Sequence, residues 1–245
     1  MVYRVDELPD LTRTDDVAAV LFSHWAVGSA ERQDATIEST GDVWNARPWP
    51  HRHLLSYSMF ACTDGDYLLN YTQWSQRSAH EVYVRTERKP RINAVDEAVR
   101  DADVHGETQR LGVVYYRRYR GTERIGPDVP GCHVVVIVEF DGPDERRQKR
   151  WADGALAAMD AAGTRADGLI AAHLHLSDDG TRVLNFAEWE SDAAHENAAD
   201  VHGLGFGSGA PEWRAMERFP GVTGVVTRRY HFQLNLLRAG DEVRA

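Results

Sequence analysis

The stretch Leu68–Glu81, LLNYTQWSQRSAHE, decides the fold because the chain repeats it as Val183–Glu196, VLNFAEWESDAAHE. The identical positions recur 115 residues apart: Leu69 as Leu184, Asn70 as Asn185, Trp74 as Trp189, Ala79 as Ala194, His80 as His195 and Glu81 as Glu196. Near the end of each copy, Arg117-Arg118-Tyr119 returns as Arg228-Arg229-Tyr230. An ordered set of matches that includes tryptophan indicates an internal duplication.

Both copies predict the same order of elements. In the first we expect strands at 17–23, 54–63, 66–74 and 111–119, with helices at 30–40 and 75–85. In the second we expect strands at 134–140, 169–178, 181–189 and 222–236, with helices at 144–162 and 191–200. Pro90 and Pro211 suit the first turn of a further helix in each copy. The Asp-Gly turns at 64–65 and 179–180 are typical of β-hairpins.

The order β-α-β-β-α-β is ferredoxin-like. The sequence therefore predicts an α+β chain with an N-terminal extension at 1–16, a first domain at 17–120, a linker at 121–131, a second domain at 132–237 and a tail at 238–245. A sheet covered by helices on one face leaves its other face bare. We therefore expect the two tandem units to pack sheet to sheet, as an intramolecular dimeric α+β barrel.

Composition and charge limit the kinds of molecule that the protein is expected to bind. The formal net charge of -10 at pH 7 argues against binding to nucleic acid, whose phosphates an acidic protein repels. The chain has no apolar run long enough to cross a membrane and no apolar signal core in its first residues. We therefore expect a soluble cytoplasmic protein that needs neither nucleic acid nor membrane, either as a monomeric pseudo-dimer or as a homodimer.

Candidate site residues follow from the alternation of side chains along a strand, which puts residues four apart on one face. Asn70 and Trp74 therefore point the same way. A two-residue turn at 64–65 pairs Met59 with Asn70, Tyr57 with Thr72 and Leu55 with Trp74, and the same alternation brings His53 onto this face. His80 follows in the next helix, where it can look back over the sheet.

The second copy predicts a related but more apolar pocket. Asn185 and Trp189 share a face, and His195 follows them at the same spacing as His80 follows Trp74. The expected register sets Leu174 opposite Asn185 and Ala172 opposite Ala187, with His173 and His175 on the other face. We therefore expect the first copy to hold the working site.

The strand pattern N-x-x-x-W, the polar residue six positions later and the ferredoxin-like order resemble the antibiotic biosynthesis monooxygenase family. The resemblance covers most of the chain, twice. It implies oxidation of phenolic or anthrone-type polyketide intermediates to quinones by O₂, without flavin, haem or metal. It also implies that the strand Asn and Trp of each copy line a pocket. Where the family has a phenolic tyrosine, this chain has His80 and His195, so the proton-transfer step differs.

The leading hypothesis is a cofactor-independent monooxygenase that acts on an aromatic polyketide-like substrate in antibiotic or secondary-metabolite biosynthesis. A polyketide cyclase or aromatase on the same fold, and a non-catalytic binding protein, are the alternatives. The catalytic candidates are His80, Asn70, Trp74 and Tyr57, and the substrate-binding candidates are His53, Met59, Asn185, Trp189 and His195. The pairs His51-x-His53 and His173-x-His175 lack an evident third ligand, so we expect no metal site.

Overall fold

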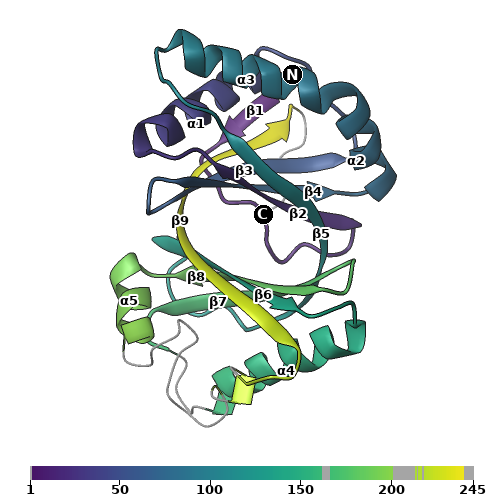
Figure 1. Cartoon of the computed structure of the whole chain (residues 1–245), viewed down its shortest axis with the longest axis vertical. Helices are drawn as coiled ribbons and strands as arrows, with labels where there is room; N and C mark the ends of the chain where they lie inside the picture. The colour runs from purple at the N-terminus through teal and green to yellow at the C-terminus, as the bar shows by residue number, and fades with distance from the viewer. Residues whose placement is uncertain (1, 162–165, 201–212, 214, 217, 240–245) are drawn as a thin grey trace. The chain divides into compact units, whose positions relative to one another are not determined.

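The computed structural model describes residues 2–161, 166–200, 213, 215–216 and 218–239 (Figure 1). These residues form two compact units. Unit 1 is Met1–Tyr115 with Phe232–Ala245, and unit 2 is Tyr116–His231. Each unit combines one antiparallel sheet with helices in the predicted order, which confirms an α+β fold built from two ferredoxin-like units.

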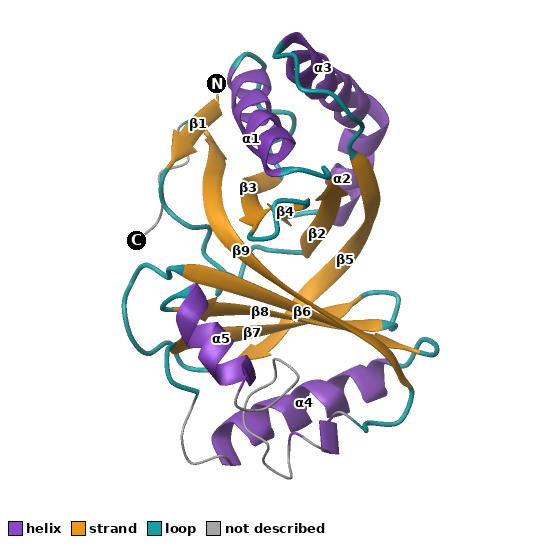
Figure 2. Ribbon diagram, turned by 60° about the vertical axis from the view of Figure 1, so that its left-hand side comes forward, coloured by secondary structure: helices purple, strands orange, loops and turns teal. Residues whose placement is uncertain are grey.

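Unit 1 has its helices on one face of its sheet (Figure 2). Its strands are ordered β1-β9-β3-β4-β2-β5. The elements are β1 (Val2–Val5), β2 (Ala19–Ala26), α1 (Ala30–Asn45), β3 (Leu54–Cys62), β4 (Tyr67–Trp74), α2 (Arg77–Tyr83), the π-helical turn η1 (Val84–Arg88), α3 (Lys89–Asp101) and the first part of β5 (Gln109–Gly121). Helix α1 begins where the Ser29 side chain accepts a hydrogen bond from the Arg32 amide at 3.2 Å.

Unit 2 repeats this arrangement. Its elements are β6 (Cys132–Phe140), α4 (Glu145–Ala161), β7 (Leu169–Ser177), β8 (Arg182–Trp189), α5 (Asp192–Asp200) and most of β9 (Val222–Arg238). Trp151 and Ala155 of α4 pack in one core with Val134 and Leu174 of the sheet. The helix expected at Pro211 lies outside the described residues.

The last strand of each unit continues into the other unit. Strand β5 pairs its final residues, Tyr116–Gly121, with β7 in unit 2. Strand β9 first pairs with β6, and its end then lies beside β1 and β3 in unit 1. These added segments cover the edges of β3 and β7, whose backbone groups would otherwise lack partners. For this reason the units differ from the expected domain limits, and the segment 1–16 contributes β1 to the sheet.

The hairpin registers position the candidate site. Met59 pairs with Asn70 and Tyr57 with Thr72, as predicted, and in unit 2 Leu174 pairs with Asn185. The predicted pairing of Leu55 with Trp74 is wrong. A bulge between Leu54 and Ser56 shifts the register, so that Leu54 pairs with Trp74. None of the described helices is long and apolar enough to span a membrane.

Candidate active site

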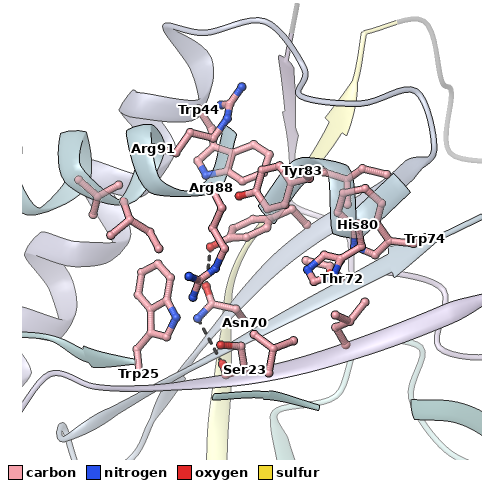
Figure 3. A pocket seen from close by; sticks show the side chains of 16 residues that line it. Ser23, Trp25, Trp44, Asn70, Thr72, Trp74, His80, Tyr83, Arg88 and Arg91 are labelled. Carbon is pink, nitrogen blue, oxygen red and sulfur yellow. Dashed lines mark hydrogen bonds between the residues drawn. The ribbon is translucent and has the colours of Figure 1, made fainter. Parts of the chain in front are cut away.

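A pocket lies in unit 1 between the sheet and the helices, with about 620 Å³ of space when its open mouth is counted (Figure 3). Strands β2, β3, β4 and β5 supply its floor, and α1, α2, η1 and α3 supply its walls. It is lined by Leu21, Ser23, Trp25, Trp44, Leu54, Tyr57, Asn70, Thr72, Trp74, His80, Tyr83, Arg88, Arg91, Ile92, Val95 and Val113. Four residues predicted from the sequence, Asn70, Trp74, His80 and Tyr57, thus meet in one cavity.

Asn70 is held in one orientation. The Tyr57 hydroxyl donates to Asn70 Oδ1 at 2.5 Å, and Asn70 Nδ2 donates to the Ser23 carbonyl at 3.3 Å (Figure 3). Because a hydroxyl donor faces the oxygen, the amide cannot be turned over without losing this bond. An amide nitrogen carries two hydrogens, so one N–H of Asn70 stays available to a ligand oxygen.

Tyr57 orients Asn70 rather than exchanging protons. Its side chain is buried, and burial raises the pKa of its hydroxyl far above the usual value for tyrosine. The ring stacks on Trp44 with centroids 4.3 Å apart. Both features keep the hydroxyl protonated and fixed in direction.

Trp74 and His80 form a second fixed pair. The Trp74 indole N–H donates to Thr72 Oγ1 at 3.0 Å, and the His80 ring meets the Trp74 ring edge-on at 5.1 Å. Nδ1 of His80 lies 2.7 Å from the Tyr115 hydroxyl. The strand and the helix that follows it therefore hold both rings at one end of the pocket.

His80 is neutral near physiological pH. Burial, together with the positive charges of Arg88 and Arg77, lowers its pKa to about 4. A neutral imidazole can accept a proton, but an imidazolium ion with so low a pKa readily gives it back.

The sequence prediction missed the residues that the helices contribute. Trp44 comes from the end of α1, Tyr83 from α2, Arg88 from η1 and Arg91 from α3. Tyr83 lies three residues after His80, a spacing that puts two helical residues on one face, so it could have been found. Arg88 is the last residue of a π-helical turn, which changes the helical phase and is often found at functional sites.

Two predicted residues lie away from the pocket lining. Met59 is fully buried in the core of unit 1, in the strand below Asn70. His53 Nδ1 lies 2.8 Å from Ser75 Oγ, and its ring stacks on His51. The bulge after Leu54 explains this placement, because it reverses the alternation of side chains from which His53 was placed on the pocket face.

The second copy keeps the rings but not their partners. Trp189 and His195 meet edge-on at 5.0 Å, much like the first pair, and burial lowers the pKa of His195. Among the described residues, however, Asn185 Oδ1, Trp189 Nε1 and both ring nitrogens of His195 are buried without a hydrogen-bond partner. The residues at the positions of Tyr57 and Thr72 are Ala172 and Ala187, which pair in the same register and offer no polar group.

Metal ligands are not gathered in the part of the chain that the structure describes. Within it, no group of three or more His, Cys, Asp or Glu side chains is placed to hold a metal ion. The groups that the pocket of unit 1 offers are hydrogen-bond donors, one neutral imidazole and aromatic walls. Such a site can bind a flat aromatic molecule, stabilise a negative oxygen and accept a proton.

Comparison with known proteins supports the predicted resemblance. Residues 133–201 match the model of the family described as antibiotic biosynthesis monooxygenase. This match lies in the second copy and confirms the resemblance to that family. No curated protein sequence matches the chain.

Solved structures share the fold over most or all of the chain. A protein described as anthrone oxidase-like has a TM-score of 0.66 and 16% identity, with 100% of this chain and 99% of that chain covered. A putative monooxygenase from Fusobacterium nucleatum subsp. nucleatum has a TM-score of 0.52 and 9% identity, covering 93% of this chain and 97% of that chain. A putative monooxygenase from Lactobacillus acidophilus has a TM-score of 0.50 and 10% identity, covering 88% and 95%. At these identities the likeness is one of fold.

Proposed function

We propose that the pocket of unit 1 is the active site of a cofactor-independent monooxygenase. Its substrate would be a phenolic or anthrone-type aromatic, of the kind that antibiotic and other secondary-metabolite pathways oxidise. The observation that carries this proposal is the Tyr57–Asn70–Ser23 hydrogen-bond chain, which holds an amide donor at a cavity with aromatic walls and a neutral His80. The family match of residues 133–201 supports the reaction class.

The chemistry needs no redox group of the protein. An electron-rich phenol or anthrone that loses a proton becomes an anion that can pass one electron to O₂. The resulting radical and superoxide combine to a peroxide at the ring carbon. Loss of water then leaves a carbonyl, so that a CH₂ group and O₂ become C=O and H₂O. One oxygen atom enters the product and the other leaves as water.

Each residue has a defined task in this scheme. Asn70 donates its free N–H to the substrate oxygen as negative charge develops there, and a donor that is already oriented stabilises such charge best. His80 receives the proton. Trp74 and Trp44 form apolar walls that keep water from the anion and strengthen the hydrogen bond to it.

Unit 1 is preferred over unit 2 because its polar groups are oriented. In unit 1 the carbonyl of Asn70, the indole of Trp74 and the imidazole of His80 each have a partner in the chain. In unit 2 the matching atoms of Asn185, Trp189 and His195 have none among the described residues. A catalytic donor that is not held in place loses much of its effect, since small misplacements are costly.

The test is oxygen uptake with a model anthrone, with the quinone product measured in parallel. We expect one O₂ consumed per quinone formed. His80→Ala should lower turnover by about 10²–10⁴-fold, the usual effect of removing an acid–base group. His195→Ala, which removes the equivalent ring in unit 2, is the matched control and should change turnover little.

The outcomes separate the alternatives. A ring-closed or dehydrated product that forms equally well without O₂ would assign the pocket to a cyclase or aromatase. Binding of the anthrone with no product of either kind would indicate a binding protein. Loss of activity in His195→Ala, with His80→Ala unaffected, would move the active site to unit 2.

A further inference from the structure

One charged side chain in the unit 1 pocket, that of Arg88, has no role in the reaction proposed above. Arg88, the last residue of the π-helical turn η1, lines the cavity, and Figure 3 shows its side chain reaching from the helix toward Asn70. Its positive charge acts on three residues of the same cavity: it helps to lower the pKa of His80, and it partly opposes the rise in pKa that burial causes in Tyr57 and Tyr83. The guanidinium therefore lies close to the reacting end of the pocket.

Neighbouring arginines are paired, whereas Arg88 is not. Arg110 forms an ion pair with Asp96 at 2.7 Å, and Arg91 donates to the Pro48 carbonyl while it stacks on Trp44. Arg88 makes no hydrogen bond or ion pair with any described residue, and the described residues that line the pocket include no aspartate or glutamate. A half-buried cation thus faces a cavity whose walls are mainly aromatic and aliphatic.

From this geometry we propose that the pocket binds its aromatic ligand as an oxyanion, with Arg88 as the counter-ion. This inference rests on the proposed function and names the substrate class: an aromatic acid. The negative oxygen is either a ring oxygen that has lost its proton or a carboxylate attached to the ring.

The physical argument is one of charge balance. Two opposite charges attract far more strongly beside apolar walls than in water, and a guanidinium offers two parallel N–H donors to one anion. Two other polar groups at the cavity are donors as well. Asn70 has one free N–H, and the Tyr83 hydroxyl stays protonated because burial raises its pKa to about 12. A negatively charged ligand oxygen matches these donors best, because it also balances the charge of the guanidinium.

Binding of an anion would also change His80. The charge of Arg88 is one of the causes that lower the His80 pKa. An anion beside Arg88 cancels that effect, so the imidazole becomes a better proton acceptor when the ligand is present. The empty pocket would hold a weak base, and the occupied pocket a stronger one.

The test measures binding without O₂, so that it does not depend on turnover. Tryptophan fluorescence or calorimetry would give the Kd of three ligands with the same ring system: 2-naphthoate, its neutral analogue 2-naphthamide, and 2-naphthol. The proteins are the wild type, Arg88→Gln and Arg85→Gln. Arg85 is the matched control because it lies exposed in the same π-helical turn and does not line the pocket.

We expect the wild type and Arg85→Gln to bind an anionic ligand about tenfold or more tightly than the amide, the usual effect of a hydrogen bond to a charged group. Arg88→Gln should lose that preference and keep its affinity for 2-naphthamide. A carboxylate ligand gives a preference for naphthoate at every pH above 6. A ring oxyanion instead gives naphthol binding that tightens as pH rises, with weak binding of naphthoate.

Equal affinity of the wild type for all three ligands at every pH would overturn the inference. So would an equal loss of preference in Arg85→Gln and Arg88→Gln. Either result would leave the proposed reaction standing, because a neutral substrate can still be oxidised to a quinone. In turn, a preference for anions that depends on Arg88 would survive a finding that no O₂ is consumed.

Discussion

Tyr57→Phe tests whether the hydroxyl of Tyr57 holds Asn70 in place. The substitution removes one oxygen atom and keeps the ring, so the stack on Trp44 at 4.3 Å remains. What is lost is the bond of 2.5 Å to Asn70 Oδ1, in a part of the pocket floor where the Asn70 side chain is 4% exposed. The amide oxygen is then left without a donor.

The expected cost follows from that burial. A buried acceptor without a partner destabilises a protein by about 1–3 kcal/mol. For a chain of this size, each kcal/mol lowers the melting temperature by roughly 2–4 °C. Tyr57→Phe should therefore lower it by roughly 2–12 °C and should also lower kcat, because the amide is free to turn its oxygen toward the substrate.

A double-mutant cycle with Asn70→Leu isolates the pair. When both partners are apolar, neither the hydroxyl nor the amide oxygen is left unpaired. The destabilisation of the double variant should therefore be smaller than the sum of the two single effects by about 0.5–3 kcal/mol. Tyr71→Phe is the control for turnover, since Tyr71 is buried on the opposite face of the neighbouring strand β4. The reasoning fails if Tyr57→Phe melts with the wild type and keeps full turnover.

Two further predictions concern other buried groups. Thr72→Val removes the acceptor of the Trp74 indole N–H and should destabilise the protein by about 1–2 kcal/mol in urea titrations; an unchanged urea midpoint would show that the bond contributes nothing. Burial lowers the pKa of His133 to about 4 and of His175 to about 3, so the unfolded chain takes up their protons first as pH falls below about 6.5. The free energy of unfolding should therefore decrease as pH falls from about 6.5 toward 4, by about 1.4 kcal/mol for each such histidine per pH unit. The urea concentration at the unfolding midpoint should therefore be lower at pH 5 than at pH 7. The control His105→Gln, which removes an exposed histidine, should show the same decrease. Equal midpoints at the two pH values would contradict the prediction.

The sequence predicted those parts of the site that depend on local regularity. A hairpin with a two-residue turn has a fixed register, and side chains alternate along its strands. These two rules were enough to bring Tyr57 and Asn70 to one face and to place Trp74 beside them. They failed at Leu55, because a bulge is an extra residue that the apolar pattern does not reveal.

The pocket residues that come from the helices could not be predicted in the same way. Trp44 reaches the pocket because α1 packs on the sheet, which is a tertiary contact between segments far apart in the chain. Arg88 reaches it from the end of a π-helical turn, where the usual spacing of helical faces no longer holds. Pattern rules assume an unbroken helical period, and Arg88 lies where that period is broken.

The two copies show why a repeated motif is weak evidence for a repeated activity. Asn, Trp and His recur at the same spacing, and the two Trp–His pairs have nearly the same geometry, 5.1 Å and 5.0 Å. What differs is the set of residues that hold them: at the repeat spacings, Tyr57 is replaced by Ala172, Thr72 by Ala187 and Tyr115 by Val226. Each change removes the hydrogen-bond partner of one member of the motif. Catalysis by hydrogen bonding depends on donors that are already oriented, so the partners decide which copy can work. A search for the motif alone finds both copies, whereas a search for the motif together with its partners finds unit 1.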